Sequence, residues 1–225
     1  MGLIRTCIPS AKLENDAYDW WKRHESKKDW SKTNKAKAIF FGDSITHFWS
    51  KEDNINYGED SWDEFFAGKD VLNMGYGFDR IQNTLWHIEA GEVDHQEPAV
   101  IVVNIGTNNL TSSGNYPGDN VEDTAEGIRF LTEKLHEKFP SAHIVVMEIL
   151  PRGGNVFEKV KSTNAILKKT IPLLPYAQLI DASAAFLDAD GNPDPQFFKK
   201  DMCHLCRKGY MVWYAAIKDI LAKYL

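Results

Sequence analysis

Five short apolar runs recur along the chain. They are Ala38–Phe41, Val71–Met74, Ala99–Ile105, His143–Ile149 and Gln178–Ile180. Each run is nearly continuous instead of alternating with polar residues, which is typical of strands that are buried on both faces. The pattern therefore predicts five strands in the interior of the protein.

Helical patterns separate and follow these runs. The clearest one covers Glu122–Phe139, where apolar residues recur at steps of three and four, and similar stripes occupy Lys161–Leu174 and Lys208–Tyr224. Such spacing gives each helix one apolar face that can pack on a sheet. Strands that alternate with helices at this pace predict a parallel sheet with right-handed crossovers. We expect an α/β fold, a three-layer α/β/α sandwich whose five-stranded parallel sheet has the flavodoxin-like order 2-1-3-4-5.

The chain has 225 residues, a length that suits one α/β domain. Residues 1–37, which are rich in tryptophan, are predicted to form an N-terminal helical arm, and residues 38–225 the domain itself. A basic stretch at Lys22–Lys37 is interrupted by acidic residues and tryptophan. It is interpreted as the solvated face of a helix and its exit loop.

The net charge and the hydropathy of the chain argue against nucleic acid and a membrane span. A formal net charge of −6 argues against nucleic acid, and an apolar run of about 18 residues that could span a membrane does not occur. The start of the chain is too short for a secretion signal, so a cytoplasmic location is the default, with a secreted or periplasmic one if a leader has been removed. Gly2 fits a loose myristoylation pattern, for which chance is the better explanation. A homo-oligomer is compatible with the sequence.

Two motifs suggest metal binding at first sight. Cys203 and Cys206 form a C-x-x-C pair, but zinc would need two further ligands at motif spacing. The stretch Asp188–Asn192 resembles the start of a calcium loop and lacks the glutamate at the twelfth position. We therefore predict no metal and no organic cofactor.

Residues that could take part in catalysis or ligand binding follow three of the predicted strands. They are Ser44, the segment Gly75–Asp79 and Asn108. The carboxyl ends of parallel strands meet at one edge of the sheet, where ligands bind near the topological switch point. These residues are therefore expected to lie together.

Ser44 has the attributes of a nucleophile. It follows a strand and opens a helix, where the helix dipole and its own backbone N–H favour negative charge. Asp43 is an equally good helix cap, which leaves Ser44 free for another role. His204 is the candidate base, because Asp201 lies three residues before it and can hold its Nδ1 proton. Together the three supply what acyl transfer through a serine requires.

Asn108 and His47 complete the candidate residues. A carboxamide N–H at a rigid strand end can donate to a developing oxyanion, although a turn asparagine is the simpler interpretation of Asn108 taken by itself. His47 is a rival base because it lies three residues from Ser44, but it has no evident carboxylate partner in the sequence. It is predicted to line the site instead.

At this point the chain resembles the SGNH, or GDSL-type, hydrolase family. The resemblance rests on four motif blocks in order: Gly42-Asp43-Ser44, Asn73 to Asp79, Gly106-Thr107-Asn108-Asn109 and Asp201 to His204. Leu85-Trp86, Gly91-Glu92 and Leu150-Pro151-Arg152-Gly153 are similar to the subgroup around the platelet-activating-factor acetylhydrolase catalytic subunits. The resemblance runs from about Ala38 to the C-terminus.

The resemblance implies a role for each matching residue. Ser44 would be the nucleophile, His204 the base and Asp201 the residue that orients it. The oxyanion donors would be the Ser44 N–H, a backbone N–H of the second block and the Asn108 side chain. The family glycine before the aspartate is replaced here by Phe78, so either Gly77 or Phe78 would supply the second donor.

The function that follows is that of a serine esterase acting through an acyl-enzyme. His47, Trp49, Tyr76 and Phe78 are expected to line the substrate pocket, and such aromatic and polar residues suit a small polar ester or a carbohydrate ester. We expect the enzyme to remove short acyl groups, acetyl first among them. The alternatives are a lysophospholipase or thioesterase and, less favoured, a carbohydrate-binding protein without catalysis.

Overall fold

The computed structural model describes residues 4–114 and 116–225, so the Gly2 pattern lies outside the described residues. At its centre is a five-stranded parallel sheet in the order β2-β1-β3-β4-β5. The strands are β1 (Ala38–Gly42), β2 (Val71–Gly75), β3 (Val100–Asn104), β4 (His143–Met147) and β5 (Ala177–Ile180). The predicted α/β class and sheet order are confirmed.

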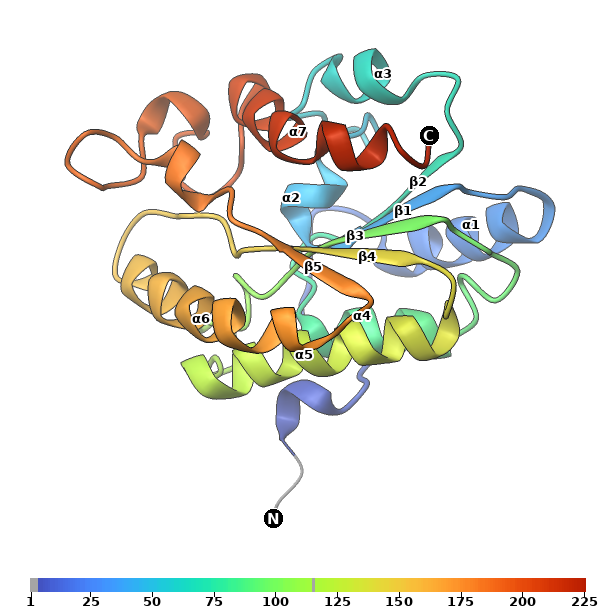
Figure 1. The fold of residues 1–225 in the computed structure, drawn as a ribbon, viewed down its shortest axis with the longest axis horizontal. Coiled ribbons are helices and arrows are strands. Elements are labelled where there is room, and N and C mark those ends of the chain that lie inside the picture. Colours follow the sequence, from blue (N-terminus) through green and yellow to red (C-terminus); the bar gives the residue numbers. More distant parts are fainter. Residues whose placement is uncertain (1–3, 115) are drawn as a thin grey trace.

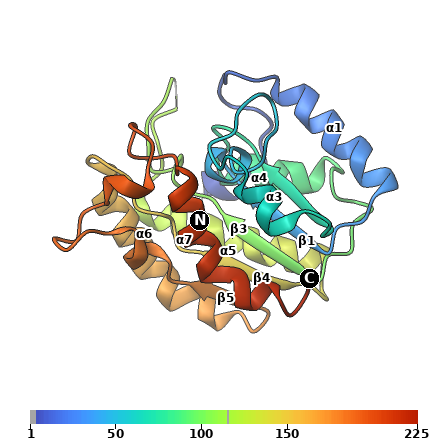
Figure 2. The same ribbon diagram turned by 90° about the horizontal axis from the view of Figure 1, so that it is seen from above.

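Helices cover both faces of the sheet (Figure 1). One face carries α1 (Trp20–Thr33), α4 (Ile81–Glu89), α5 (Val121–Lys138) and α6 (Val156–Thr170), and the other carries α3 (Ser61–Phe66) and α7 (Arg207–Leu221). Short 3₁₀ turns complete the described elements: Arg5–Cys7, Ile171–Leu173, Ser183–Phe186 and Pro195–Phe197. Figure 2 shows α1 and α6 on opposite sides of the molecule. No helix among the described residues is both long and apolar enough to cross a membrane.

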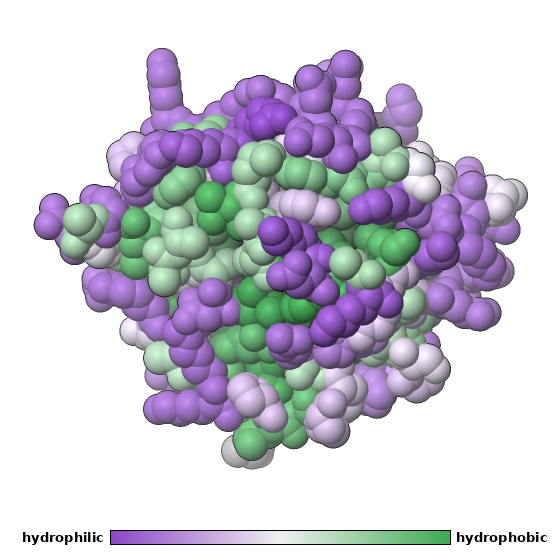
Figure 3. Space-filling view, turned by 45° about the horizontal axis from the view of Figure 1, so that its top comes forward, coloured by the Kyte–Doolittle hydropathy of each residue, from purple (hydrophilic) through white to green (hydrophobic). Residues whose placement is uncertain are grey.

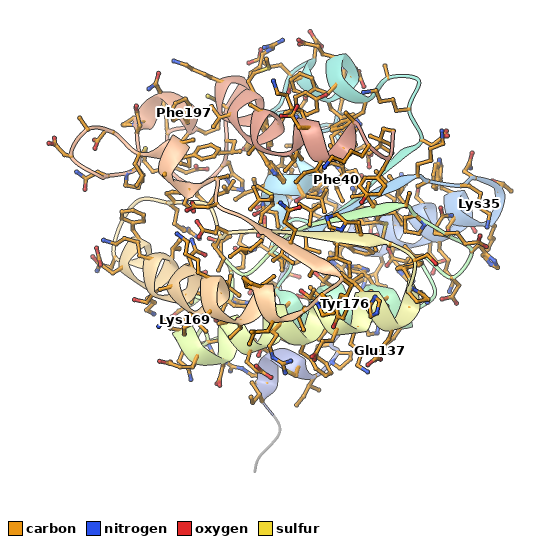
Figure 4. All side chains as sticks on the ribbon, viewed as in Figure 1. Lys35, Phe40, Glu137, Lys169, Tyr176 and Phe197 are labelled. Carbon is orange, nitrogen blue, oxygen red and sulfur yellow. The ribbon has the colours of Figure 1, made fainter. Side chains whose placement is uncertain are left out.

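The apolar run of β1 is continuous because both faces of the strand pack against other elements. Ile39 and Phe41 join the core beneath α4 and α5, whereas Ala38 and Phe40 join the core beneath α7. Figure 4 shows Phe40 between the sheet and α7. Because both faces are covered, every residue of the strand is buried.

The predicted helices are found with small shifts in their bounds. The stripe at Glu122–Phe139 becomes α5, Lys208–Tyr224 becomes α7, and α6 begins at Val156, before the predicted Lys161. The hydrophobic pattern did not reveal α4. This helix buries Gln82, Asn83 and Thr84 through hydrogen bonds, so polar residues interrupt its apolar stripe.

The N-terminal arm packs into the core. Trp20 is 1% exposed and joins the hydrophobic cluster beneath the sheet. The interpretation of the basic stretch as a solvated face is wrong for two of its residues, because Arg23 and Lys27 are buried and both pair with Glu52. Elsewhere the surface mixes apolar patches with hydrophilic side chains (Figure 3).

Two glycines allow a short helix to lie against the ends of β1 and β2. This helix is α2 (Ser44–His47). A Cβ on Gly42 would lie 2.1 Å from Thr46 Oγ1, and a Cβ on Gly75 would lie 2.3 Å from the backbone nitrogen of His47. The helix that begins at Ser44 can therefore occupy this position only if both strand ends lack a side chain.

We predict that Gly75→Ala destabilises the protein by more than about 2 kcal/mol, because the new methyl group meets backbone and not a flexible side chain. Gly191→Ala is the control, since a Cβ there meets open space and only its positive φ of 80° carries a cost, about 1 kcal/mol. Urea unfolding of both variants checks this. Equal losses of stability would contradict the close-approach argument.

Candidate active site

Ser44 lies at the end of β1, where it is the first residue of α2. The helix is capped by Asp43, whose Oδ1 accepts a hydrogen bond of 2.9 Å from the N–H of Ile45. Burial raises the pKa of Asp43 to about 7, against the opposing effects of that N–H and of Arg152. Within the described part of the chain the N–H of Ser44 donates no hydrogen bond. The Ser44 hydroxyl and this N–H are both available to a ligand.

His204 and Asp201 approach Ser44 from the other end of the chain. The Nε2 atom of His204 lies 2.8 Å from Ser44 Oγ, and its Nδ1 atom lies 2.7 Å from Asp201 Oδ2. The carboxylate assigns the proton to Nδ1, which leaves Nε2 as the acceptor for the serine hydroxyl. A hydroxyl, an imidazole and a carboxylate are thus connected in series.

The loop that carries His204 is held by its own acid. Asp201 Oδ1 accepts the backbone N–H groups of Cys203 and His204, each at 2.9 Å. Burial tends to raise the pKa of Asp201, but the hydrogen bonds from the His204 ring and from these amides lower it. The carbonyl of Met202 accepts the N–H of Gly153 at 2.7 Å. Asp201 therefore stays ionised and fixes both the ring and the loop.

Asn108 is oriented by the loop that follows β2. Its Nδ2 donates to the carbonyl of Asp79 at 2.9 Å, which uses one of its two N–H groups. The Arg80 guanidinium donates to the carbonyl of Asn108 and, at 3.2 Å, to that of Thr111. The carboxamide is held rigidly and keeps one free donor.

The backbone donors at Gly77 and Phe78 differ. The N–H of Gly77 donates to His47 Nδ1 at 3.2 Å, and His47 Nε2 lies 3.0 Å from Asp53 Oδ2. Burial lowers the pKa of His47 to about 4, so the ring is neutral and can accept the Gly77 N–H. Phe78 has a φ of +59°, and among the described residues its N–H donates to no acceptor. Only the Phe78 amide of this pair is left for a ligand.

Three side chains predicted to line the substrate pocket are instead buried. His47, Trp49 and Tyr76 are each 0% exposed. Trp49 donates to Ser61 Oγ at 3.1 Å inside the core, and the Tyr76 hydroxyl donates to Glu92 Oε2 at 2.6 Å. This part of the prediction is wrong, because both faces of these segments are covered by other elements. Phe78, by contrast, is 44% exposed.

The N-terminal arm lines part of a cavity beside Phe78, which the sequence did not indicate. A cavity of about 550 Å³ is lined by Leu13, Glu14, Asn15, Phe78, Ser113 and Tyr116, among others. Glu14 is fixed there by its ion pair with Arg80. The contacts span up to 99 residues of sequence, so no local motif could reveal them.

Asp16 is a second arm residue beside the site. Its Oδ2 lies over Gly77, where an added Cβ would approach it to 1.9 Å. Burial raises the pKa of Asp16, while the N–H of Ala17 and the nearby His204 oppose that shift. A larger residue at position 77 would therefore have to displace the Asp16 side chain of the arm.

The groups that could hold a metal do not include Ser44, His204 or Asp201. Within the described residues, His24, His87 and Glu92 form one buried cluster of suitable ligands. Both imidazoles already contact the same oxygen of Glu92, and its other oxygen accepts the Tyr76 hydroxyl. Hydrogen bonds thus already satisfy this donor set.

The C-x-x-C motif is not arranged as a metal site either. Cys203 is buried, and burial raises the pKa of its thiol to about 11, which disfavours the thiolate that a metal needs. Cys206 donates to the carbonyl of Gln196 at 3.2 Å.

The chain is similar in sequence to known proteins. The family model for GDSL-like lipase/acylhydrolases matches residues 40–212. The α1 subunit of human platelet-activating factor acetylhydrolase IB is 30% identical over 198 residues, which are 87% of this chain and 79% of that one. The bovine α2 subunit is 30% identical over 188 residues, 82% of this chain and 76% of that one.

Solved structures show the same fold. A GDSL-like lipase from Bacteroides thetaiotaomicron has a TM-score of 0.72 at 19% identity and covers 92% of this chain and 98% of its own. An acetylxylan esterase from Geobacillus stearothermophilus has a TM-score of 0.63 at 17% identity, with coverages of 84% and 94%. The family match and its relatives support ester hydrolysis as the activity, and the chain belongs to the GDSL-like lipase/acylhydrolase family.

Proposed function

We propose that this protein is a serine esterase and that Ser44, His204 and Asp201 are its catalytic residues. The observation that carries the proposal is the series of contacts from Ser44 Oγ to His204 Nε2 and from His204 Nδ1 to Asp201. His204 takes the proton as Ser44 attacks the ester carbonyl, and returns it to the leaving alcohol. Water, activated by the same imidazole, then attacks the acyl-enzyme, and Ser44 recovers its proton as the acid leaves.

The oxyanion that forms in both steps is assigned to three donors. They are the N–H of Ser44, the N–H of Phe78 and the free N–H of the Asn108 carboxamide. Gly77 is left out because its N–H already donates to His47. Each remaining donor is fixed by backbone or by a hydrogen bond before substrate arrives, which is what makes such groups effective.

We infer that the substrate carries a short acyl group, acetyl above all, on a polar or carbohydrate alcohol. The cavity beside Phe78 supports this, because aromatic rings there lie among polar side chains such as Asn15 and Ser113. The proteins that the chain resembles agree on the acyl group, since one is an acetylhydrolase and another an acetylxylan esterase. They differ on the alcohol.

A phospholipid acetyl ester is the second candidate. It is favoured by the 30% identity to the platelet-activating factor acetylhydrolase subunits over most of the chain. Hydrolysis of acetylated xylo-oligosaccharides compared with that of an acetylated ether phospholipid separates the two. Faster turnover of the phospholipid would replace the carbohydrate assignment without affecting the catalytic residues.

Ser44→Ala and His204→Ala should each lower kcat by several orders of magnitude, roughly 10⁴-fold or more, with little loss of stability. The double variant should be almost no worse than either single one, because the two residues act as a unit. Hydrolysis of p-nitrophenyl acetate and labelling by a fluorophosphonate provide the measurements. Labelling that persists in Ser44→Ala would disprove the assignment.

Phe78→Gly should retain turnover of short esters, because the site needs the amide of residue 78 and glycine adopts its positive φ without strain. Asn108→Ala, which removes a donor, should lower kcat by about 10²-fold to 10³-fold. Measurements of kcat/KM for acetyl and hexanoyl esters should show that losing the ring changes the preference between them. An unchanged preference with a large fall in melting temperature would show that Phe78 serves packing and not the pocket.

A further inference from the structure

A chain of charged side chains is buried behind the loop that carries Phe78. Glu92, His87 and Asp79 are 0%, 1% and 3% exposed. The His87 ring lies between the two carboxylates, with its Nε2 2.8 Å from Asp79 Oδ2 and its Nδ1 against Glu92 Oε1. We call these three residues the buried relay.

The geometry sets the charge of the relay. Both nitrogens of His87 face carboxylate oxygens, and an imidazolium, with an N–H on each nitrogen, satisfies both. Burial by itself would lower the pKa of His87, yet Glu92 and Asp79 outweigh it and raise that pKa to about 9. Burial also raises the pKa of Asp79, and the positive charge of His87 opposes that shift, so the charged ring and its two carboxyl neighbours stabilise one another.

Helix α1 completes the relay from the N-terminal arm. Trp20 Nε1 donates to Asp79 Oδ1 at 2.8 Å, and His24 Nδ1 contacts the same Glu92 oxygen as His87. Trp20 and His24 also stack at a ring separation of 6.1 Å. Every carboxylate oxygen of the relay therefore has a partner, which fixes where Asp79 can lie.

Asp79 links the relay to the proposed oxyanion donors. Its carbonyl accepts the Asn108 carboxamide, and it directly follows Phe78, whose φ of +59° is costly for a residue with a side chain. Such a conformation persists only where the surroundings hold it. The Phe78 ring is half exposed, so its own packing does not fix this conformation. The contacts of the residues on either side of Phe78 must fix it instead.

We propose that His87 is a positioning residue which, clamped between Glu92 and Asp79, holds the Phe78 amide and the Asn108 carboxamide in place for the oxyanion. The inference rests on the proposed serine esterase function. A relay that only stabilised the fold would affect unfolding and leave kcat unchanged at temperatures where the protein is folded.

The test measures kcat and KM for phenyl acetate in His87→Gln, well below its melting temperature. Glutamine keeps a polar group of similar reach but loses the positive charge. The expected result is a kcat about 10-fold to 100-fold lower, less than removal of a whole donor, with KM changed by less than about threefold. His136→Gln is the matched control, because this histidine stacks on Tyr176 at a ring separation of 3.6 Å and touches none of the relay.

Trp20→Phe is a second variant that keeps the ring in the core and removes only the donor to Asp79. It should lower kcat about threefold to tenfold, since Asp79 keeps its contact with His87. If His87→Gln does not fold, this variant distinguishes a positioning role of the relay from a role in stability alone. The proposal would be overturned if either variant folds and has the same kcat as the wild type.

A double-mutant cycle separates positioning from a general loss of stability. If His87 acts through the oxyanion donors, His87→Gln should cost less in an Asn108→Ala background than in the wild type, because one of the groups it positions is gone. Fully additive losses would contradict the proposal.

The wild-type protein gives a third readout that needs no variant. Since the pKa of His87 is raised, its contribution is complete below its unfolded value near 6.5 and is lost as the pH rises through about 9. The groups that face the ring are Glu92, Asp79, His24 from α1 and Tyr76 from the loop after β2. The kcat should fall reversibly above pH 9, and this fall should vanish in His87→Gln.

A kcat that stays level through pH 10 in the wild type would overturn the proposal. Fluorophosphonate labelling of the wild type distinguishes this failure from that of the function itself. If Ser44 is labelled while the relay variants turn over normally, the esterase assignment stands and the relay is structural. If Ser44 is not labelled, the proposed function has failed first.

Discussion

The close approach of α2 to the ends of β1 and β2 is the constraint on which the site depends. Gly42 and Gly75 leave no room for a Cβ, so the helix lies directly on the backbone of both strands. This contact fixes the position of Ser44 at the end of β1. It also places the His47 ring in contact with the loop after β2. A single packing constraint thus positions Ser44, the proposed nucleophile, and decides which amide of that loop remains free.

The choice between the two amides follows from an ordinary hydrogen bond. A buried, neutral His47 needs a partner for Nδ1, and the N–H of Gly77 supplies it. Phe78 then adopts a left-handed backbone conformation, and its own N–H donates to no acceptor among the described residues. The departure from the family glycine places a half-exposed ring beside the cavity, where it can influence which alcohol or acyl group is accepted.

Much of the fold could be predicted because buried parallel strands leave a strong apolar signal, as at Ala38–Phe41 and Val71–Met74. Ser44, Asn108 and His204 could be brought to one edge because each follows a strand or precedes a helix in a known order. The sequence could not say which way His47 points, since one residue of rotation on a short helix moves a side chain from the cavity to the core. It also could not show that Glu14 from the arm reaches Arg80, because that ion pair joins segments without a shared motif.

The N-terminal arm contacts the hydrophobic core, the cavity and the loop after β2. It fills the core through Trp20, lines the cavity through Glu14 and supports the loop after β2 through the hydrogen bond from Trp20 to Asp79. Those contacts form on folding from segments more than fifty residues apart, so they depend on the completed sheet. The N-terminal arm is thereby connected to the edge of the sheet that carries the proposed active site.

A crystal structure of the fluorophosphonate adduct tests the central claim most directly. The account predicts a phosphorus bonded to Ser44 Oγ, with its free oxygen accepting hydrogen bonds from the amides of Ser44 and Phe78 and from Asn108 Nδ2, while Gly77 still donates to His47. A phosphonyl oxygen bound by the Gly77 amide, with His47 turned away, would contradict it, as would an adduct on any other residue.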